Sequence, residues 1–199
     1  MNDSIATHVD VLILGSGLAG QSLALRLADT RKVALVTKKT LDDSASSWAQ
    51  GGIAAVLDPA DSTDAHVADT LTAGAGLCNP AATRFVVDSG REAIDWLINR
   101  GVAFTRDESA LGYHLTREGG HGQRRVIHAA DATGAEVQKT LTAQVVAHPN
   151  IQIFEHHIAV DLINATKLGM PQARCLGAYV LDTVSGHVNH AILWVDAPG

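Results

Sequence analysis

The sequence predicts an α/β fold that opens with a nucleotide-binding βαβ unit and ends in antiparallel strands. Val9–Leu14 is a short, nearly continuous apolar run, which is typical of parallel strands covered on both faces. Residues 15–20 read GSGLAG, and a leucine- and alanine-rich segment separates them from a second apolar run, Lys32–Thr37. Strand, glycine turn, helix and strand within about 30 residues is the order of a βαβ unit.

The middle of the chain favours helices. We expect one at Thr63–Leu77, a longer one at Pro80–Arg100 and a third at Ala132–Ala147. Asn79 can cap the second helix and Gly101 can end it. Its apolar positions recur at helical spacing and are expected on one face: Phe85, Val86, Ala93, Trp96 and Leu97.

The last quarter of the chain has the pattern of short strands separated by turn residues. The expected strands are Ile151–Phe154, Ile158–Ile163, Cys175–Leu181 and His187–Val195. Their even spacing predicts an antiparallel β-meander. Segments 38–59 and 105–132 are rich in polar residues and glycine, so we expect loops there.

Composition narrows the class of protein. Hydrophobic residues make up 46% of the 199 residues and charged residues 18%, as in ordinary soluble globular proteins. A net charge of −6 without a basic stripe disfavours a nucleic-acid partner. Cys78 and Cys175 lie far apart and outside any metal-binding spacing, so we expect small buried side chains in a reducing compartment. No signal peptide or membrane-spanning run is recognisable, which predicts a cytoplasmic protein.

The glycine loop is the clearest functional motif. Gly15, Gly17 and Gly20 fit GxGxxG directly after a strand and at the start of a helix. In a Rossmann-like unit these glycines make the tight turn, let the backbone approach a pyrophosphate and let the helix pack closely on the strand. The alternative is a glycine turn with a purely structural role.

The motif alone does not choose the dinucleotide. An acidic residue is expected about 20 residues further on, where it would bond to the ribose. Here the second strand ends in Thr37 and Lys38, followed by Lys39, and Asp42 and Asp43 come late. An ordinary NAD site is therefore disfavoured, whereas NADP or an atypical flavin site fits; solvated lysines are the alternative interpretation.

Three motifs carry a resemblance to a known family. Residues 44–56 read SASSWAQGGIAAV, residues 114–121 read HLTREGGH, and residues 124–134 read RRVIHAADATG. Together they resemble the L-aspartate oxidases, which belong to the succinate dehydrogenase and fumarate reductase flavoprotein group. The similarity runs from about Val9 to about Ala165, and the group also ends its second strand in Thr/Ser-Lys. It implies that residues 1–199 form the N-terminal part of an FAD-binding domain.

The resemblance implies specific FAD contacts. The position of the histidine that joins FAD covalently in succinate dehydrogenases is Ala45 here, so the flavin is expected to be non-covalent. The residues expected at the phosphates and ribose are Gly15, Ser16, Gly17, Leu18, Ala19, Gly20 and Lys38. Those expected around the flavin are Ala45, Ser46, Ser47, Trp48, Ala49, Gln50, Gly51 and Gly52. The backbone at Ile158 and Ala159 is expected near the adenine.

The resemblance also implies a reaction, the oxidation of L-aspartate to iminoaspartate, which begins NAD biosynthesis through quinolinate. Hydride would pass to the flavin, and oxygen or fumarate would take the electrons; quinolinate synthase is a candidate partner. Glu118 is expected to orient the substrate's amino group, because a carboxylate pairs well with an ammonium in a partly dry site. His121 is expected near the flavin, with a loop histidine bonded to backbone as the alternative.

Other polar residues have plainer interpretations. A metal site at His114, His121 and His128 is disfavoured by their spacing. The arginines at 117, 124 and 125 could attract a dicarboxylate or could be solvated surface residues. Trp48 and Trp96 are expected to pack, and residues 131–134 to cap the following helix.

The family is much longer than 199 residues. It adds a capping domain and a C-terminal helical domain that this sequence lacks, and the final residues 195–199 depart from the family pattern. We therefore expect a truncated form with little activity by itself. A non-catalytic dinucleotide-binding fragment, a fumarate reductase-like flavoprotein and an NADP-dependent reductase are the alternative functions.

Overall fold

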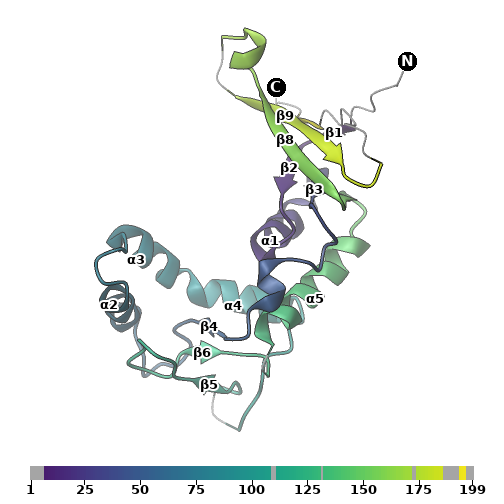
Figure 1. Ribbon diagram of the computed structural model, residues 1–199. Helices are drawn as coiled ribbons and strands as arrows, with labels where there is room; N and C mark the ends of the chain where they lie inside the picture. The colour runs from purple at the N-terminus through teal and green to yellow at the C-terminus, as the bar shows by residue number, and fades with distance from the viewer. Residues whose placement is uncertain (1–6, 109–110, 131, 172–173, 186–192, 196–199) are drawn as a thin grey trace. The chain divides into compact units, whose positions relative to one another are not determined.

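The computed structural model describes residues 7–108, 111–130, 132–171, 174–185 and 193–195. The chain divides into two compact units. The first unit comprises residues 1–45 and 141–199, and the second unit comprises residues 46–140 (Figure 1). None of the helices in the described ranges is long and apolar enough to cross a membrane.

The first unit is built on a parallel sheet of three strands. These are β2 (Val11–Leu14), β3 (Val33–Val36) and β7 (Ile151–Phe154), in the order β2-β3-β7. Helix α1 (Leu18–Leu27) connects β2 to β3, which confirms the predicted βαβ unit. All four residues of β3 are buried, as expected for a central parallel strand. β7 was expected in the antiparallel meander but lies in this parallel sheet.

The predicted first strand is divided at Asp10. Residues before it form β1 (Thr7–Val9), which pairs in parallel with β10 (Leu193–Val195), and those after it form β2. The Asp10 carboxylate accepts a hydrogen bond of 2.7 Å from the backbone N–H of Lys32, which fixes the chain where it changes sheets. Most of the strand expected at 187–195 lies outside the described residues.

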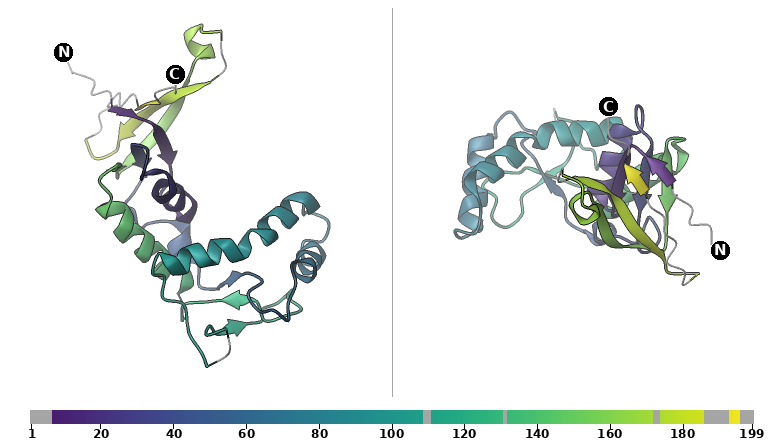
Figure 2. Two further views of the ribbon diagram at one scale, coloured as in Figure 1. Left: turned by 180° about the vertical axis from the view of Figure 1, so that it is seen from behind. Right: turned by 90° about the horizontal axis from the view of Figure 1, so that it is seen from above.

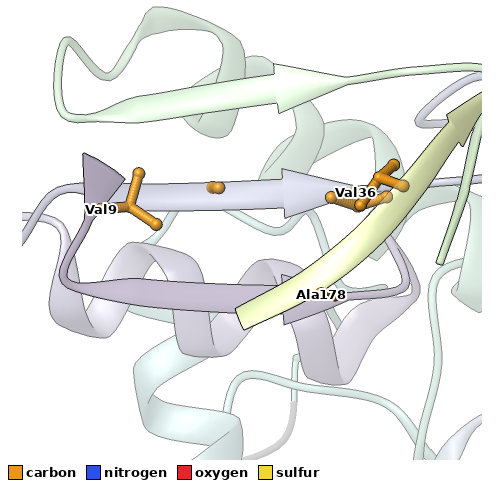
Figure 3. Close-up of a cluster of buried hydrophobic side chains, with 5 residues drawn as sticks. Val9, Val36 and Ala178 are labelled. Carbon is orange, nitrogen blue, oxygen red and sulfur yellow. The ribbon is translucent and has the colours of Figure 1, made fainter. Parts of the chain in front are cut away.

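The antiparallel part of the first unit is a twisted ribbon of β8 (His157–Asn164) and β9 (Cys175–Asp182), clearly seen in Figure 2. A short helix, η2 (Thr166–Leu168), follows β8. Figure 3 shows Ala178 of β9 beside Val36 of β3, in a core cluster that also contains Val9. The ribbon therefore packs on the parallel sheet, and the predicted α/β class with parallel and antiparallel strands is confirmed.

The second unit combines helices with a small antiparallel sheet. Its elements are η1 (Ala45–Trp48), β4 (Ile53–Ala54), α2 (Thr63–Ala73), α3 (Pro80–Asp88), α4 (Gly90–Asn99), β5 (Leu115–Thr116) and β6 (Val126–Ile127). The strand order is β4-β6-β5. The expectation that residues 105–132 are entirely loop was wrong, since β5 and β6 lie there. They were missed because strands of two residues are too short to show an alternating pattern. Helix α5 (Thr133–Ala147) continues from the second unit into the first, close to its predicted bounds.

The single helix expected at 80–100 is two helices, joined directly at Ser89 (Figures 1 and 2). The Ser89 hydroxyl donates to the Phe85 carbonyl at 2.8 Å, and such a bond competes with the helical backbone pattern. On these two helices Phe85 is 73% exposed, whereas Val87 and Ile94 are buried. The predicted apolar face was therefore wrong. The predicted ends were right, since Asn79 caps the first turn at 3.0 Å and Gly101 has φ +91°.

Candidate functional site

The carboxyl ends of the three parallel strands lie at one edge of the sheet, because Leu14, Val36 and Phe154 are in register. The Gly15 N–H donates to the Val36 carbonyl at 2.8 Å, and the Thr37 N–H donates to the Phe154 carbonyl at 2.9 Å. The glycine loop and the segment that begins with Thr37 therefore start side by side. In open α/β sheets this edge is where ligands bind.

The glycines of the loop have the geometry that a pyrophosphate needs. Gly15 has φ +110°, a conformation that residues with a Cβ rarely adopt. A Cβ on Gly20 would collide with the Gly15 carbonyl oxygen and lie 3.3 Å from Ile13 Cγ2. Gly17 is the N-cap of α1 in extended conformation and brings no side chain that could cap the helix. Among the described residues no side chain caps the positive end of α1, so these residues fit a dinucleotide phosphate.

Polar side chains beneath the loop hold it in place. Ser16 is buried, with its hydroxyl 2.9 Å from Thr37 Oγ1 and 3.3 Å from the Leu41 carbonyl. Gln21, fully buried on α1, donates to the Ser16 carbonyl at 2.9 Å and to Thr142 Oγ1 at 3.0 Å. The Ser16 side chain therefore points into the protein. Sequence reasoning missed Gln21, although a glutamine among leucines and alanines could have drawn attention to it.

Charge at this edge is distributed unevenly. Lys38 is exposed and makes no hydrogen bond or ion pair within the described part of the chain, whereas Lys39 pairs with Asp43 at 2.7 Å. Glu155 follows β7, and its carboxylate accepts a 2.7 Å bond from the Leu41 N–H. The Glu155 carboxylate, which sequence reasoning overlooked, therefore holds the loop, and Lys38 is an exposed cation that no described residue pairs with.

Ile158 and Ala159 lie near the start of β8, opposite Leu181 and Val180 of β9. β8 begins next to the same sheet edge, since the His157 N–H donates to the Thr37 carbonyl at 2.9 Å. Between Ala159 and Asp161 the pairing register shifts. A role for these two residues toward adenine stays a prediction.

In the second unit, residues 46–52, here called the AQGG segment, pack closely against the backbone of α5 and β6. A Cβ on Gly134 would collide with the Ser46 carbonyl oxygen and lie 2.8 Å from Ala49 Cβ. A Cβ on Gly52 would collide with the Ile127 carbonyl oxygen. These glycines permit close packing of the AQGG segment on α5 and β6. Within this segment Trp48 is 79% exposed, so the expectation that it packs was wrong.

Glu118 lies beside the AQGG segment. A Cβ placed on Gly51 would be 3.8 Å from Glu118 Oε2, and the glutamate is otherwise exposed. The Glu118 carbonyl accepts a bond of 3.2 Å from the His121 N–H, and Gly120 between them has φ +83°. Glu118 and His121 thus belong to one tight turn, with the carboxylate facing the predicted flavin segment.

Arg125 is neither a solvated arginine nor a free anion receptor. Its side chain is fully buried, with Nε 2.8 Å and Nη2 2.9 Å from the Asp61 carboxylate, while Nη1 is 2.6 Å from Asp69. The Gly122 N–H and then the Arg125 guanidinium hold the pKa of Asp69 below 3.8. Burial raises the pKa of Asp61, but hydrogen bonds from Arg125 and the Ser62 N–H outweigh it and lower that pKa. Both expectations for Arg125 were therefore wrong; Arg117 and Arg124 are exposed.

The three histidines of the disfavoured metal site are not brought together. His114 Nδ1 lies 2.8 Å from His128 Nε2, whereas His121 packs edge-on against His66 with ring centroids 5.5 Å apart. Across the described ranges no group of three His, Cys, Asp or Glu side chains is placed to hold a metal ion.

The remaining side chains that the sequence singled out divide between packing and exposure. Trp96 is partly buried under the Arg100 guanidinium, which agrees with a packing role. Cys78 is half-buried, but Cys175 is exposed, contrary to expectation. Residues 131–134 include one position outside the described ranges, so their capping role stays a prediction.

The βαβ unit and its glycine-loop helix without a side-chain cap are the features of a dinucleotide-binding domain, and Lys38 is exposed shortly after the second strand. Residues 10–198 match the family described as FAD binding domain. The chain belongs to this family, and the prediction of FAD as cofactor is confirmed.

Curated relatives and solved structures are similar to this chain over most of its length. The chain is 61% identical over 186 residues to L-aspartate oxidase 1 of Ralstonia nicotianae, and the match covers 93% of this chain and 35% of the relative. It is 55% identical to the L-aspartate oxidase of Pseudomonas aeruginosa, and the match covers 90% of this chain and 35% of that relative. The FrdA chain of a mutant E. coli quinol fumarate reductase superimposes with a TM-score of 0.80 at 27% identity, covering 89% and 30%. The predicted resemblance is confirmed, and the chain spans about a third of the length of these relatives.

Proposed function

We propose that this chain is the FAD-binding portion of an enzyme that oxidises L-aspartate to iminoaspartate, with oxygen or fumarate as electron acceptor. The observation that carries the proposal is the placement of the Glu118 carboxylate beside Gly51 in the AQGG segment. The similarity to proteins named L-aspartate oxidase supports it.

The chain contributes binding and orientation to this reaction. The loop from Gly15 to Gly20 and the Lys38 ammonium bind the phosphates and ribose, residues 46–52 contact the flavin ring, and the backbone at 158–159 contacts the adenine. When bound, FAD supplies the ring that accepts a hydride. Ala45 offers no nucleophile, so the cofactor is held without a covalent bond.

The segment around Glu118 has the charges that an amino dicarboxylate needs. Glu118 supplies an anion for the substrate ammonium. Arg117 and Arg124 line one cavity together with Thr116, Gly122 and Gln123, and supply cations for its carboxylates. A dicarboxylate without an amino group has no use for an anion here, which favours aspartate over succinate as the electron donor.

The expected setting is the cytoplasm, where the iminoaspartate would be passed to quinolinate synthase for NAD biosynthesis. The exposed Cys175 thiol, which forms no disulfide among the described residues, is compatible with a reducing compartment.

The test uses a chimaera in which this chain replaces the matching N-terminal third of the Ralstonia nicotianae relative. Glu118→Gln should lower kcat/KM for aspartate oxidation by about 10- to 100-fold, since a charge-assisted hydrogen bond is lost. Fumarate reduction should change by less than about threefold, because fumarate carries no ammonium.

Glu92→Gln is the matched control, since Glu92 is an exposed residue of α4 and lies outside the AQGG and Glu118 segments. Equal loss of both activities in Glu118→Gln would contradict its role. A parent chimaera that reduces fumarate but does not oxidise aspartate would favour a fumarate reductase-like function. The similarity of this chain to the E. coli FrdA structure makes that the main alternative.

A further inference from the structure

The turn that carries Glu118 is attached to helix α2 through one carboxylate. Asp69 Oδ2 accepts a 2.6 Å bond from the backbone N–H of Gly122, directly after the turn. The same oxygen accepts a 2.6 Å bond from Arg125 Nη1. A single atom of α2 therefore holds both the backbone of the turn and the buried arginine behind it.

Arg125 extends this attachment to the turn's last side chain. Its guanidinium is fixed by two bonds to Asp61, whose side chain is only 2% exposed. Arg125 Nη1 lies 3.4 Å from His121 Nδ1, and a guanidinium can only donate. In this contact His121 Nδ1 is therefore the acceptor.

The backbone of the turn also packs on α2. A Cβ on Gly120 would lie 3.4 Å from Ala73 Cβ, so the turn also touches α2 at the C-terminal end of that helix. The His121 N–H closes the turn on the Glu118 carbonyl at 3.2 Å. Movement at Gly122 or His121 would therefore move Glu118.

We propose that Asp69, through Gly122 and Arg125, is a positioning residue that holds the Glu118–His121 turn in the orientation needed to bind the substrate ammonium. The substrate part of this inference rests on the proposed function. Asp69 itself faces backbone and arginine, so it acts through the turn without touching substrate.

The first test is amide hydrogen exchange of peptides covering residues 117–124 in the purified chain, a measurement that requires no activity. Asp69→Ala should raise the exchange rate at Gly122 by about tenfold or more, because a hydrogen bond to a charged group is removed. Asp64→Ala is the control on the same helix: Asp64 is 84% exposed and pairs with Arg84, so exchange in 117–124 should not change.

Asp69→Asn provides a second variant if the alanine protein does not fold. Asparagine keeps the shape and one acceptor oxygen but loses the charge, so we expect an exchange rate between those of the parent and the alanine variant. Exchange at 117–124 that stays at the parent rate in the folded Asp69 variants would overturn the proposal.

The second test measures kinetics in the chimaera. Asp69→Ala should raise KM for aspartate about tenfold while kcat changes less, and Asp69→Asn should recover part of the loss; a purely structural role would lower stability and leave KM unchanged. Increased exchange with an unaltered KM would overturn the positioning role. If the parent chimaera fails to oxidise aspartate, the proposed function fails, and the exchange experiment still decides whether Asp69 holds the turn.

Discussion

At the residue scale, Gly20 illustrates a position where the side chain must be absent. A Cβ there would collide with the Gly15 carbonyl oxygen and crowd Ile13. We expect Gly20→Ala to lower the free energy of unfolding by about 1–3 kcal/mol, the usual cost of overpacking, and to weaken FAD binding. Urea unfolding and FAD titration of the purified chain measure both effects.

Gly90→Ala is the matched control. A Cβ on Gly90 would lie 3.5 Å from Ala55 Cβ, an ordinary contact, and the residue begins helix α4. Alanine should leave stability unchanged or raise it by up to about 1 kcal/mol. Equal destabilisation by the two substitutions would show that the loop does not need close approach at Gly20.

His66 links the Arg125 cluster to pH. Burial, followed by the positive charge of Arg125 and the neighbouring His121, lowers the pKa of His66 below 6.5, although Asp61 and Asp69 oppose the shift. In the described part of the chain its Nδ1 is buried without a hydrogen-bond partner. Protonation is therefore easier in the unfolded chain than in the folded one.

The sign of the pH effect follows from proton binding. Below pH 6.5 the unfolded chain takes up a proton at His66 before the folded chain does, so stability should fall as pH decreases toward the folded pKa. His66→Leu should flatten this part of a plot of unfolding free energy against pH. The loss of stability below pH 3.8, where Asp61 and Asp69 are protonated in the unfolded chain first, should remain. An unchanged slope below pH 6.5 would contradict the assignment.

At the element scale, helix ends follow local chemistry. Asn79 accepts the Ala82 N–H at the start of α3, and Pro80 occupies the first turn. We expect Asn79→Ala to lower the free energy of unfolding by about 0.5–2 kcal/mol, and Asn79→Asp to preserve it, because both polar residues cap well. Thermal unfolding followed by circular dichroism measures the difference; equal melting temperatures for all three proteins would disprove the cap's contribution.

The elements also show why pattern reasoning succeeds in some places and fails in others. β3 and α5 were predicted almost at their bounds, and α1 was predicted between the two strands, since each has a long apolar pattern or a strong turn signal. The break at Ser89 was missed because one serine hydrogen bond leaves the helical spacing of apolar residues intact. β5 and β6 were missed because two residues carry no period.

At the scale of the whole molecule, the described chain contains the glycine loop and the AQGG segment but only about a third of the length of its relatives. If the loop binds FAD as proposed, FAD should raise the melting temperature of the purified chain, by an amount equivalent to about 2.7 kcal/mol at a hundredfold excess over Kd. NADPH should not, and acid precipitation should release the flavin. Stabilisation by NADPH alone, or flavin that stays with the precipitate, would contradict the non-covalent FAD site.

Local sequence by itself determined the βαβ start and the glycine turn and disfavoured an ordinary NAD site, because these depend on backbone conformation and on residues close together in the chain. Only the tertiary structure decided what Arg125 does. Its partners Asp61 and Asp69 lie 64 and 56 residues away, and no local pattern indicates which charges will meet when α2 packs beside the Glu118 turn. The same holds for β7, whose apolar run fits either kind of sheet until β3 becomes its neighbour. Such partners are selected by packing, which depends on the whole fold.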